Sequence, residues 1–143
     1  MPSETGPVRV KVCGITNVND GVHAASLGAS ALGFIFWPHS PRYVSPDRAA
    51  SVVEATGPLT SAVGVFVDET MVRIHETVAS AKLDVVQLHG DEPYEMLRTL
   101  RVRTIRAVAL GALAPEVPID LIPPNVTALL DAHDPIGRGG SGQ

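Results

Sequence analysis

The chain has little cysteine and few aromatic residues, and both shortages exclude classes of function. Its 143 residues include one cysteine, Cys13. A single cysteine cannot form an internal disulfide or a cysteine-based zinc site, and a free thiol fits a reducing compartment, so we expect a cytoplasmic protein. Aromatic residues make up only 4% of the chain, which argues against base-stacking surfaces. The net charge of −4 gives no reason to expect a nucleic-acid partner.

Long apolar runs are also missing. No stretch approaches the roughly 18 consecutive apolar residues of a membrane-spanning helix, so we expect no membrane partner. Residues 1–7 lack the basic start and apolar centre of a signal peptide, and we expect them to form a disordered lead. With 45% hydrophobic and 18% charged residues, the remainder, 8–143, is expected to fold as one globular domain.

What the sequence does contain is a regular alternation of strand and helix patterns. Apolar, β-branched runs predict six strands at 8–13, 31–36, 62–67, 83–88, 103–109 and 126–130. Helices are expected between them, with Asn17 and Ser45 as N-caps, Pro46 as a first helical residue, and a stop near Gly57. A repeat of this kind predicts a parallel sheet built from βαβ units. Two architectures remain, an open doubly wound sheet and a closed (β/α)₈ barrel, which requires eight strands.

Several chemically reactive residues lie where predicted strands end. Cys13 ends the first strand, Gln87 and His89 lie at the end of the fourth, and Asp131 closes the sixth. Arg42 lies in the loop after the second strand. In parallel α/β folds the carboxyl ends of strands form the functional face, so these residues are candidates for one site.

Each candidate also has a simpler interpretation. A lone cysteine is usually a small buried hydrophobic residue, and an aspartate after a strand is most often a cap or turn former. Arg42 could be solvated, and His89 could satisfy backbone groups. The remaining histidines show no metal-ligand spacing, so no metal site is predicted; they are His23, His39, His75 and His133. The glycine-rich segment 139–142 lacks the strand–loop–helix context of a phosphate-binding loop.

An ordered series of motifs gives these positions a more specific meaning. The series is KVCGIT at 11–16, GFIF at 33–36, SPRYV at 40–44, GVFV at 64–67, VQLHGDE at 86–92, LLD at 129–131 and GGSG at 139–142. It resembles the phosphoribosylanthranilate isomerase family of tryptophan biosynthesis, an aromatic amino-acid pathway, from residue 8 to residue 142. The resemblance implies a TIM (β/α)₈-barrel fold and an Amadori rearrangement of N-(5-phosphoribosyl)anthranilate, a phosphorylated aminosugar.

The resemblance also implies roles for individual residues. Cys13 would be the general base, Asp131 the general acid, and Arg42 would meet the anthranilate carboxylate. Gln87 and His89 would line the substrate site. The chemistry is consistent with this assignment, because an Amadori rearrangement needs one proton donated to the ring oxygen and another removed from the neighbouring carbon. No metal or organic cofactor is needed for these proton transfers.

The chain departs from the family pattern after the sixth strand, where the family continues with about two more βα units. We therefore expect an incomplete barrel of about six βα units, with strand edges open for self-association. Without the usual phosphate-binding loops, we expect severely reduced activity. Two alternatives remain open: a non-catalytic barrel remnant that acts as an interaction module, and an unrelated open sheet of the flavodoxin type.

Overall fold

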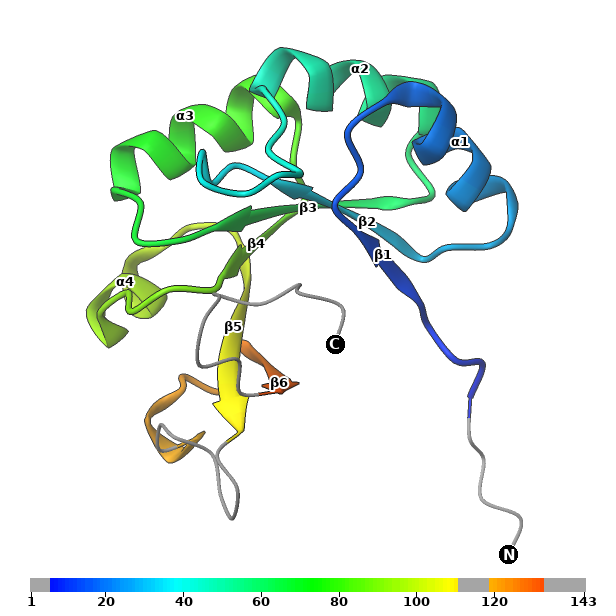
Figure 1. Ribbon diagram of the computed structural model, residues 1–143. Coiled ribbons are helices and arrows are strands. Elements are labelled where there is room, and N and C mark those ends of the chain that lie inside the picture. Colours follow the sequence, from blue (N-terminus) through cyan, green and yellow to red (C-terminus); the bar gives the residue numbers. More distant parts are fainter. Residues whose placement is uncertain (1–5, 111–118, 133–143) are drawn as a thin grey trace, which may run out of the picture.

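The computed structural model of the protein describes residues 6–110 and 119–132. Six strands alternate with helices in these two segments (Figure 1). The strands are β1 (Lys11–Cys13), β2 (Ala31–Ile35), β3 (Ser61–Phe66), β4 (Val85–Leu88), β5 (Arg103–Leu110) and β6 (Thr127–Ala132). The α-helices are α1 (Val18–Ser26), α2 (Pro46–Thr56), α3 (Met71–Ala81) and α4 (Tyr94–Thr99), and a 3₁₀-helix, η1, spans Ile119–Leu121.

The helix termini follow the capping signals of the sequence. The side chain of Asn17 accepts a hydrogen bond from the backbone N–H of Asp20 at 2.9 Å and so caps α1. Ser45 caps α2 in the same way, and Pro46 is the first helical residue, where its missing N–H costs nothing. The α2 helix ends immediately before Gly57, as predicted.

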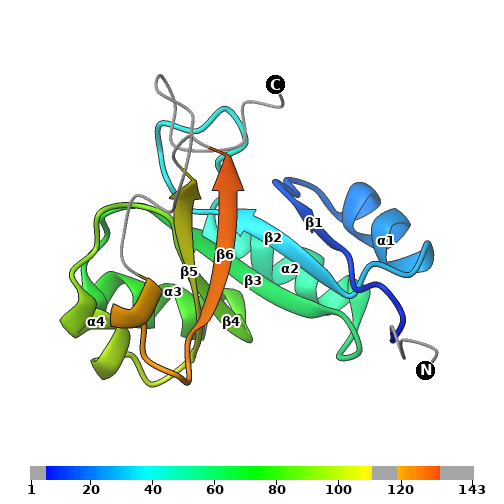
Figure 2. The ribbon, with the colours of Figure 1, turned by 90° about the horizontal axis from the view of Figure 1, so that it is seen from below.

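All six strands are parallel and follow one another in the order β1-β2-β3-β4-β5-β6. A flavodoxin-type sheet would place β1 between β2 and β3, so that alternative is wrong. The sheet curves, with α1–α4 along its convex side, and Figure 2 shows the strands succeeding one another from β1 to β6. The predicted partial (β/α)₈ barrel is confirmed as a half-barrel.

Every strand differs from its predicted range by one to three residues at one or both ends, and the first and sixth strands show the differences that bear on the site. The first strand begins at Lys11 rather than at residue 8, and Val8 lies exposed before it. The sixth strand runs on to Ala132, so Asp131 lies within the strand and not at its end. Residues 1–5 of the expected lead, His133 and the segment 139–142 fall outside the described residues.

The strand register assigns side chains to two faces of the sheet. Cys13 pairs with Gly33, Val65 with Gln87, and Ala109 with Asp131. Side chains alternate along each strand and paired residues of a parallel ladder point the same way, so Cys13, Gln87 and Asp131 share the concave inner face.

The outer face of the sheet forms the hydrophobic core with the helices. Phe34, Phe66 and Val86 are at most 2% exposed there, and Val52 of α2 and Ile74 of α3 are fully buried against them. Burial of a side chain of this size contributes about 1.5–3 kcal/mol to folding. The core therefore fixes the strands from outside, and the inner face combines apolar side chains such as Val63 and Val65 with the polar candidates.

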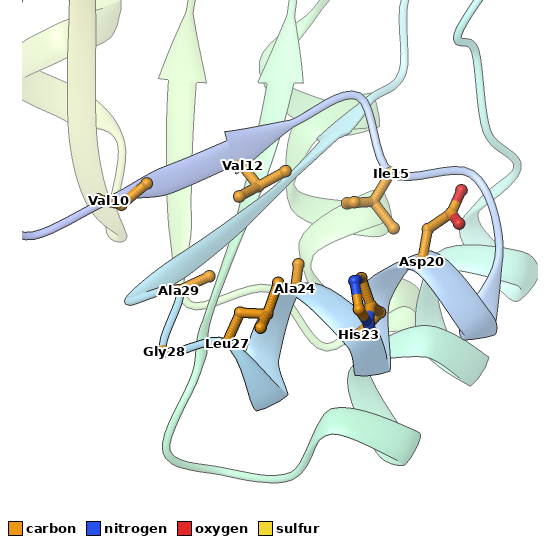
Figure 3. A pocket seen from close by; sticks show the side chains of 9 residues that line it. All are labelled: Val10, Val12, Ile15, Asp20, His23, Ala24, Leu27, Gly28 and Ala29. Atoms are coloured by element: carbon orange, nitrogen blue, oxygen red, sulfur yellow. The ribbon is translucent and has the colours of Figure 1, made fainter.

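The two outermost strands each pair on one side within the described residues. Beside β1, an apolar groove of about 510 Å³ lies between that strand and α1 (Figure 3). Its walls include Val10, Val12 and Leu27. Val12 points to the outer face, opposite Cys13, so this groove is separate from the inner-face candidates.

None of the described helices has the length and apolar character needed to cross a bilayer.

Candidate active site

Four polar side chains form a continuous hydrogen-bonded chain across the inner face. Lys11 Nζ on β1 donates to Gln87 Oε1 on β4 at 2.6 Å. Gln87 Nε2 lies 3.0 Å from His89 Nδ1, and His89 Nε2 lies 3.0 Å from Asp131 Oδ2 on β6. These hydrogen bonds link β1 to β6, the two outermost strands of the sheet, through side chains at the end of β4. Three of the predicted residues, Gln87, His89 and Asp131, are thus brought into direct contact.

The backbone holds His89 in place. Its N–H donates to the carbonyl oxygen of Phe66 at 2.9 Å, which extends the β3–β4 ladder by one step beyond β4. The ring remains on the inner face because residue 89 is two positions beyond Gln87. The His89 side chain is 16% exposed and that of Asp131 is 35% exposed, so solvent and small molecules reach both.

Cys13 and Arg42 form the second part of the site. Arg42 Nη1 donates to the backbone carbonyl oxygen of Cys13 at 3.2 Å. The free thiol of Cys13 is half-buried on the same face as Lys11, two residues earlier on β1. The structure therefore places a cationic guanidinium beside the β1 end that carries the thiol.

Two glycines make this arrangement possible. A Cβ atom at Gly33 would lie 2.7 Å from the sulfur of Cys13, so a side chain there would displace the thiol. Gly14 has a φ of +87°, and a Cβ atom there would lie 2.5 Å from Arg42 Nη1. Glycine adopts that backbone conformation without a steric penalty, so Arg42 can lie across the turn after β1.

A buried ion pair braces the loops behind His89. Arg106 on β5 donates to Glu92, whose carboxylate also accepts the backbone N–H groups of Asp68 and Gly90. The Glu92 side chain is 1% exposed and that of Arg106 is 7% exposed. Through these bonds the Glu92 carboxylate joins the loop after β3 to the loop after β4. Its contact in the second loop is Gly90, the residue that follows His89. Asp68 takes part in this brace through its backbone N–H.

Sequence reasoning missed Lys11, Glu92 and Arg106. A signal for Lys11 was present, because residues 11 and 13 of one strand must share a face. Arg106 lies between the apolar residues Ile105 and Ala107 in the middle of a strand, which indicates a buried partner for its charge. Its partner, Glu92, could not be identified, because that pairing depends on how the loop after β4 folds back.

The inner face combines three groups that can exchange protons with two that carry positive charge. A thiol, an imidazole and a carboxylate suit acid–base chemistry on a small molecule. Lys11 and Arg42 provide local positive charge that the chain as a whole, at −4, does not. Among the described residues, no group of three or more histidine, cysteine, aspartate or glutamate side chains could hold a metal ion.

Residues 10–143 match the family model described as N-(5'phosphoribosyl)anthranilate (PRA) isomerase. The chain belongs to the PRA isomerase family. The family resemblance read from the ordered motifs is thereby confirmed, and the match covers every strand and helix described above.

Individual members of the PRA isomerase family give the same result. A relative from Geobacter metallireducens is 41% identical over 136 residues, which cover 94% of this chain and 66% of that protein. The crystal structure of the enzyme from Thermotoga maritima, 35% identical, superposes with a TM-score of 0.82 and covers 96% of this chain and 67% of its own. A PRA isomerase in complex with reduced 1-(o-carboxyphenylamino)-1-deoxyribulose 5-phosphate is 36% identical, with a TM-score of 0.78; the match covers 90% of this chain and 66% of that one.

The Arg106–Glu92 brace can be tested by removing the cation. Arg106→Met leaves a buried carboxylate without its partner, and we expect the free energy of unfolding to fall by about 3–5 kcal/mol. Arg103→Met, an exposed arginine on the same strand, should change it by less than about 0.5 kcal/mol. Urea denaturation measures both. Adding Glu92→Gln to Arg106→Met should recover part of the loss; equal effects of the two arginine variants would contradict the brace.

Proposed function

We propose that this chain carries the catalytic face of a PRA isomerase of tryptophan biosynthesis. The reaction is an aldose–ketose isomerisation that converts N-(5-phosphoribosyl)anthranilate to 1-(2-carboxyphenylamino)-1-deoxyribulose 5-phosphate. The observation that carries the proposal is the placement of Cys13 and Asp131 on one face, each beside a cationic or proton-carrying neighbour. Family membership supports the same chemistry.

In the proposed reaction, Asp131 acts as the general acid and Cys13 as the general base. Asp131 gives a proton to the ring oxygen as the carbon–oxygen bond breaks, and the furanose opens to an iminium. The Cys13 thiolate then takes a proton from the adjacent carbon, which leaves an enolamine that tautomerises to the ketone. Two positioned groups of this kind account for the rearrangement without a cofactor, because the bond changes at each step are driven by a proton that one of them donates or removes.

The other predicted residues are proposed to bind substrate. Arg42 is suited to the anthranilate carboxylate, since a guanidinium presents paired donors to a planar anion. Its hydrogen bond to the Cys13 carbonyl would bring the bound carboxylate to the base. His89 and Gln87 would form the wall of the site between the acid and β1; His89 is the more exposed of the two, and Gln87 is only 2% exposed.

The chain spans about two thirds of the length of the relatives it matches. The chain spans 66% of the length of the Geobacter metallireducens protein, and that relative's activity belongs to the longer molecule. A test of the proposal therefore has to be made on these 143 residues themselves, and it has to compare variants of this chain with one another.

Cys13→Ala and Asp131→Asn should each lower turnover by about 100-fold or more, the usual contribution of a positioned acid or base. The substrate's fluorescence disappears on rearrangement and provides the assay. Asp120→Asn, an exposed aspartate in η1, is the matched control and should keep full activity. Circular dichroism should be the same for all four proteins.

A folded chain whose turnover does not depend on Cys13 and Asp131 would contradict the proposed roles. No turnover from a folded wild-type chain would favour the alternative of a non-catalytic interaction module.

We also propose that copies of the chain associate through their outermost strands. Each of β1 and β6 presents unpaired backbone groups on one side within the described residues, and such edges pair readily. Apolar side chains flank both edges: Val8 is 89% exposed, Val10 51% and Leu130 56%. An edge with adjacent apolar surface is a typical site of association between chains.

The association predicts a concentration-dependent mass. Leu130→Asp places a charge beside β6 and should raise the dissociation constant at least about tenfold, which corresponds to about 1.4 kcal/mol. Leu59→Asp, at a 96% exposed leucine in the turn before β3, should leave it unchanged. Sedimentation equilibrium measures both constants. A wild-type chain that remains monomeric at all concentrations would rule out the association.

A further inference from the structure

Lys11, the first residue in the series of hydrogen bonds on the inner face, determines which atom donates and which accepts in each of the bonds that follow. Lys11 Nζ carries only donors, so the Gln87 atom 2.6 Å away must be the amide oxygen. The amide nitrogen then faces His89 Nδ1 at 3.0 Å. That nitrogen is also only a donor, so Nδ1 must be the ring's acceptor and the ring proton must be on Nε2.

Gln87 transmits this constraint because it cannot turn over freely. It is 2% exposed, so water does not replace either of its partners. Rotating the amide by half a turn would set its N–H₂ group against the ammonium of Lys11 and its oxygen against an unprotonated Nδ1. Both contacts would be lost together. Lys11 therefore fixes the amide, and the amide fixes the tautomer of His89.

The tautomer in turn decides which oxygen of Asp131 can carry a proton. His89 Nε2–H donates to Oδ2 at 3.0 Å, and a proton on Oδ2 would weaken that bond by reducing the negative charge of its acceptor, whereas Oδ1 is not engaged by the ring. Within the described part of the chain, the His89 ring is the one hydrogen-bond partner of this carboxylate. A proton that Asp131 delivers would therefore be carried on Oδ1, away from the imidazole.

We propose that Lys11 is a positioning residue for the reaction: through Gln87 it holds His89 as the Nε2–H tautomer and so assigns proton delivery to Oδ1 of Asp131. This inference rests on the proposed function for its catalytic meaning. The arrangement of protons is independent of turnover and can be measured without substrate. Lys11 does not touch the reacting atoms, and its effect passes through two intervening side chains.

The test is the ¹⁵N spectrum of the histidine rings in the full 143-residue chain. Long-range proton–nitrogen correlations distinguish the two neutral tautomers, and His89→Gln identifies the signals of residue 89. The wild-type chain should show His89 with its proton on Nε2. Lys11→Met frees the amide of Gln87, and the spectrum should then show a mixture of tautomers.

Two further variants complete the measurement. Lys82→Met removes the chain's other lysine, which is exposed at the C-terminal end of α3, and should leave the His89 signals unchanged. Gln87→Glu replaces the amide donor with an acceptor that Lys11 can still bind. It should place a proton on Nδ1, the opposite of the wild type, and it provides a second test if Lys11→Met fails to fold.

Turnover is measured in parallel. Lys11→Met should lower kcat by about 10- to 100-fold, the scale seen when partners that orient a metal-binding histidine are removed, with little change in KM. A wild-type ring protonated on Nδ1, or an unaltered tautomer in both Lys11→Met and Gln87→Glu, would overturn the inference. Absence of turnover in the wild-type chain would contradict the proposed function, whereas the ring spectra alone decide the role of Lys11.

Discussion

The site depends on the alternation of side chains along six parallel strands in register. One slip of a strand by a single residue would move its inner side chains to the outer face. In the observed register, Lys11, Gln87 and Asp131 all face inward although 76 residues separate the first two. The apolar outer face favours this register, because a slip by one residue would turn Phe34 or Val86 away from the helices that bury them.

The two faces of the sheet therefore have different roles, one in stability and one in the candidate site. Stability comes from the outer face and its helices, where the largest side chains are fully buried. The inner face carries polar groups that would be costly in such a core, and four of them form hydrogen bonds with one another: Lys11, Gln87, His89 and Asp131. The Glu92–Arg106 ion pair contributes to stability and also supports the site, because it holds the loop that follows His89. Its charges have no role in the proposed chemistry.

Features that depend on local sequence signals could be predicted, whereas features that depend on tertiary contacts could not. The caps at Asn17 and Ser45 are local signals, so α1 and α2 begin where predicted. The sequence predicts Asp131 as a site residue at the end of a strand, but β6 continues past it because pairing with β5, a tertiary contact, extends the strand. The bond between Lys11 and Gln87 depends on the curvature of the whole sheet, and no local pattern reports that curvature.

We propose above all that substrate binds on the concave inner face and not in the groove between β1 and α1. The most direct measurement is a titration of the chain with reduced 1-(o-carboxyphenylamino)-1-deoxyribulose 5-phosphate, the ligand bound by a solved relative, observed at the histidine rings by NMR. The account predicts a saturable shift of the His89 signals while those of His23, in the groove, stay constant. A shift at His23 without one at His89, or no shift at either ring, would contradict it.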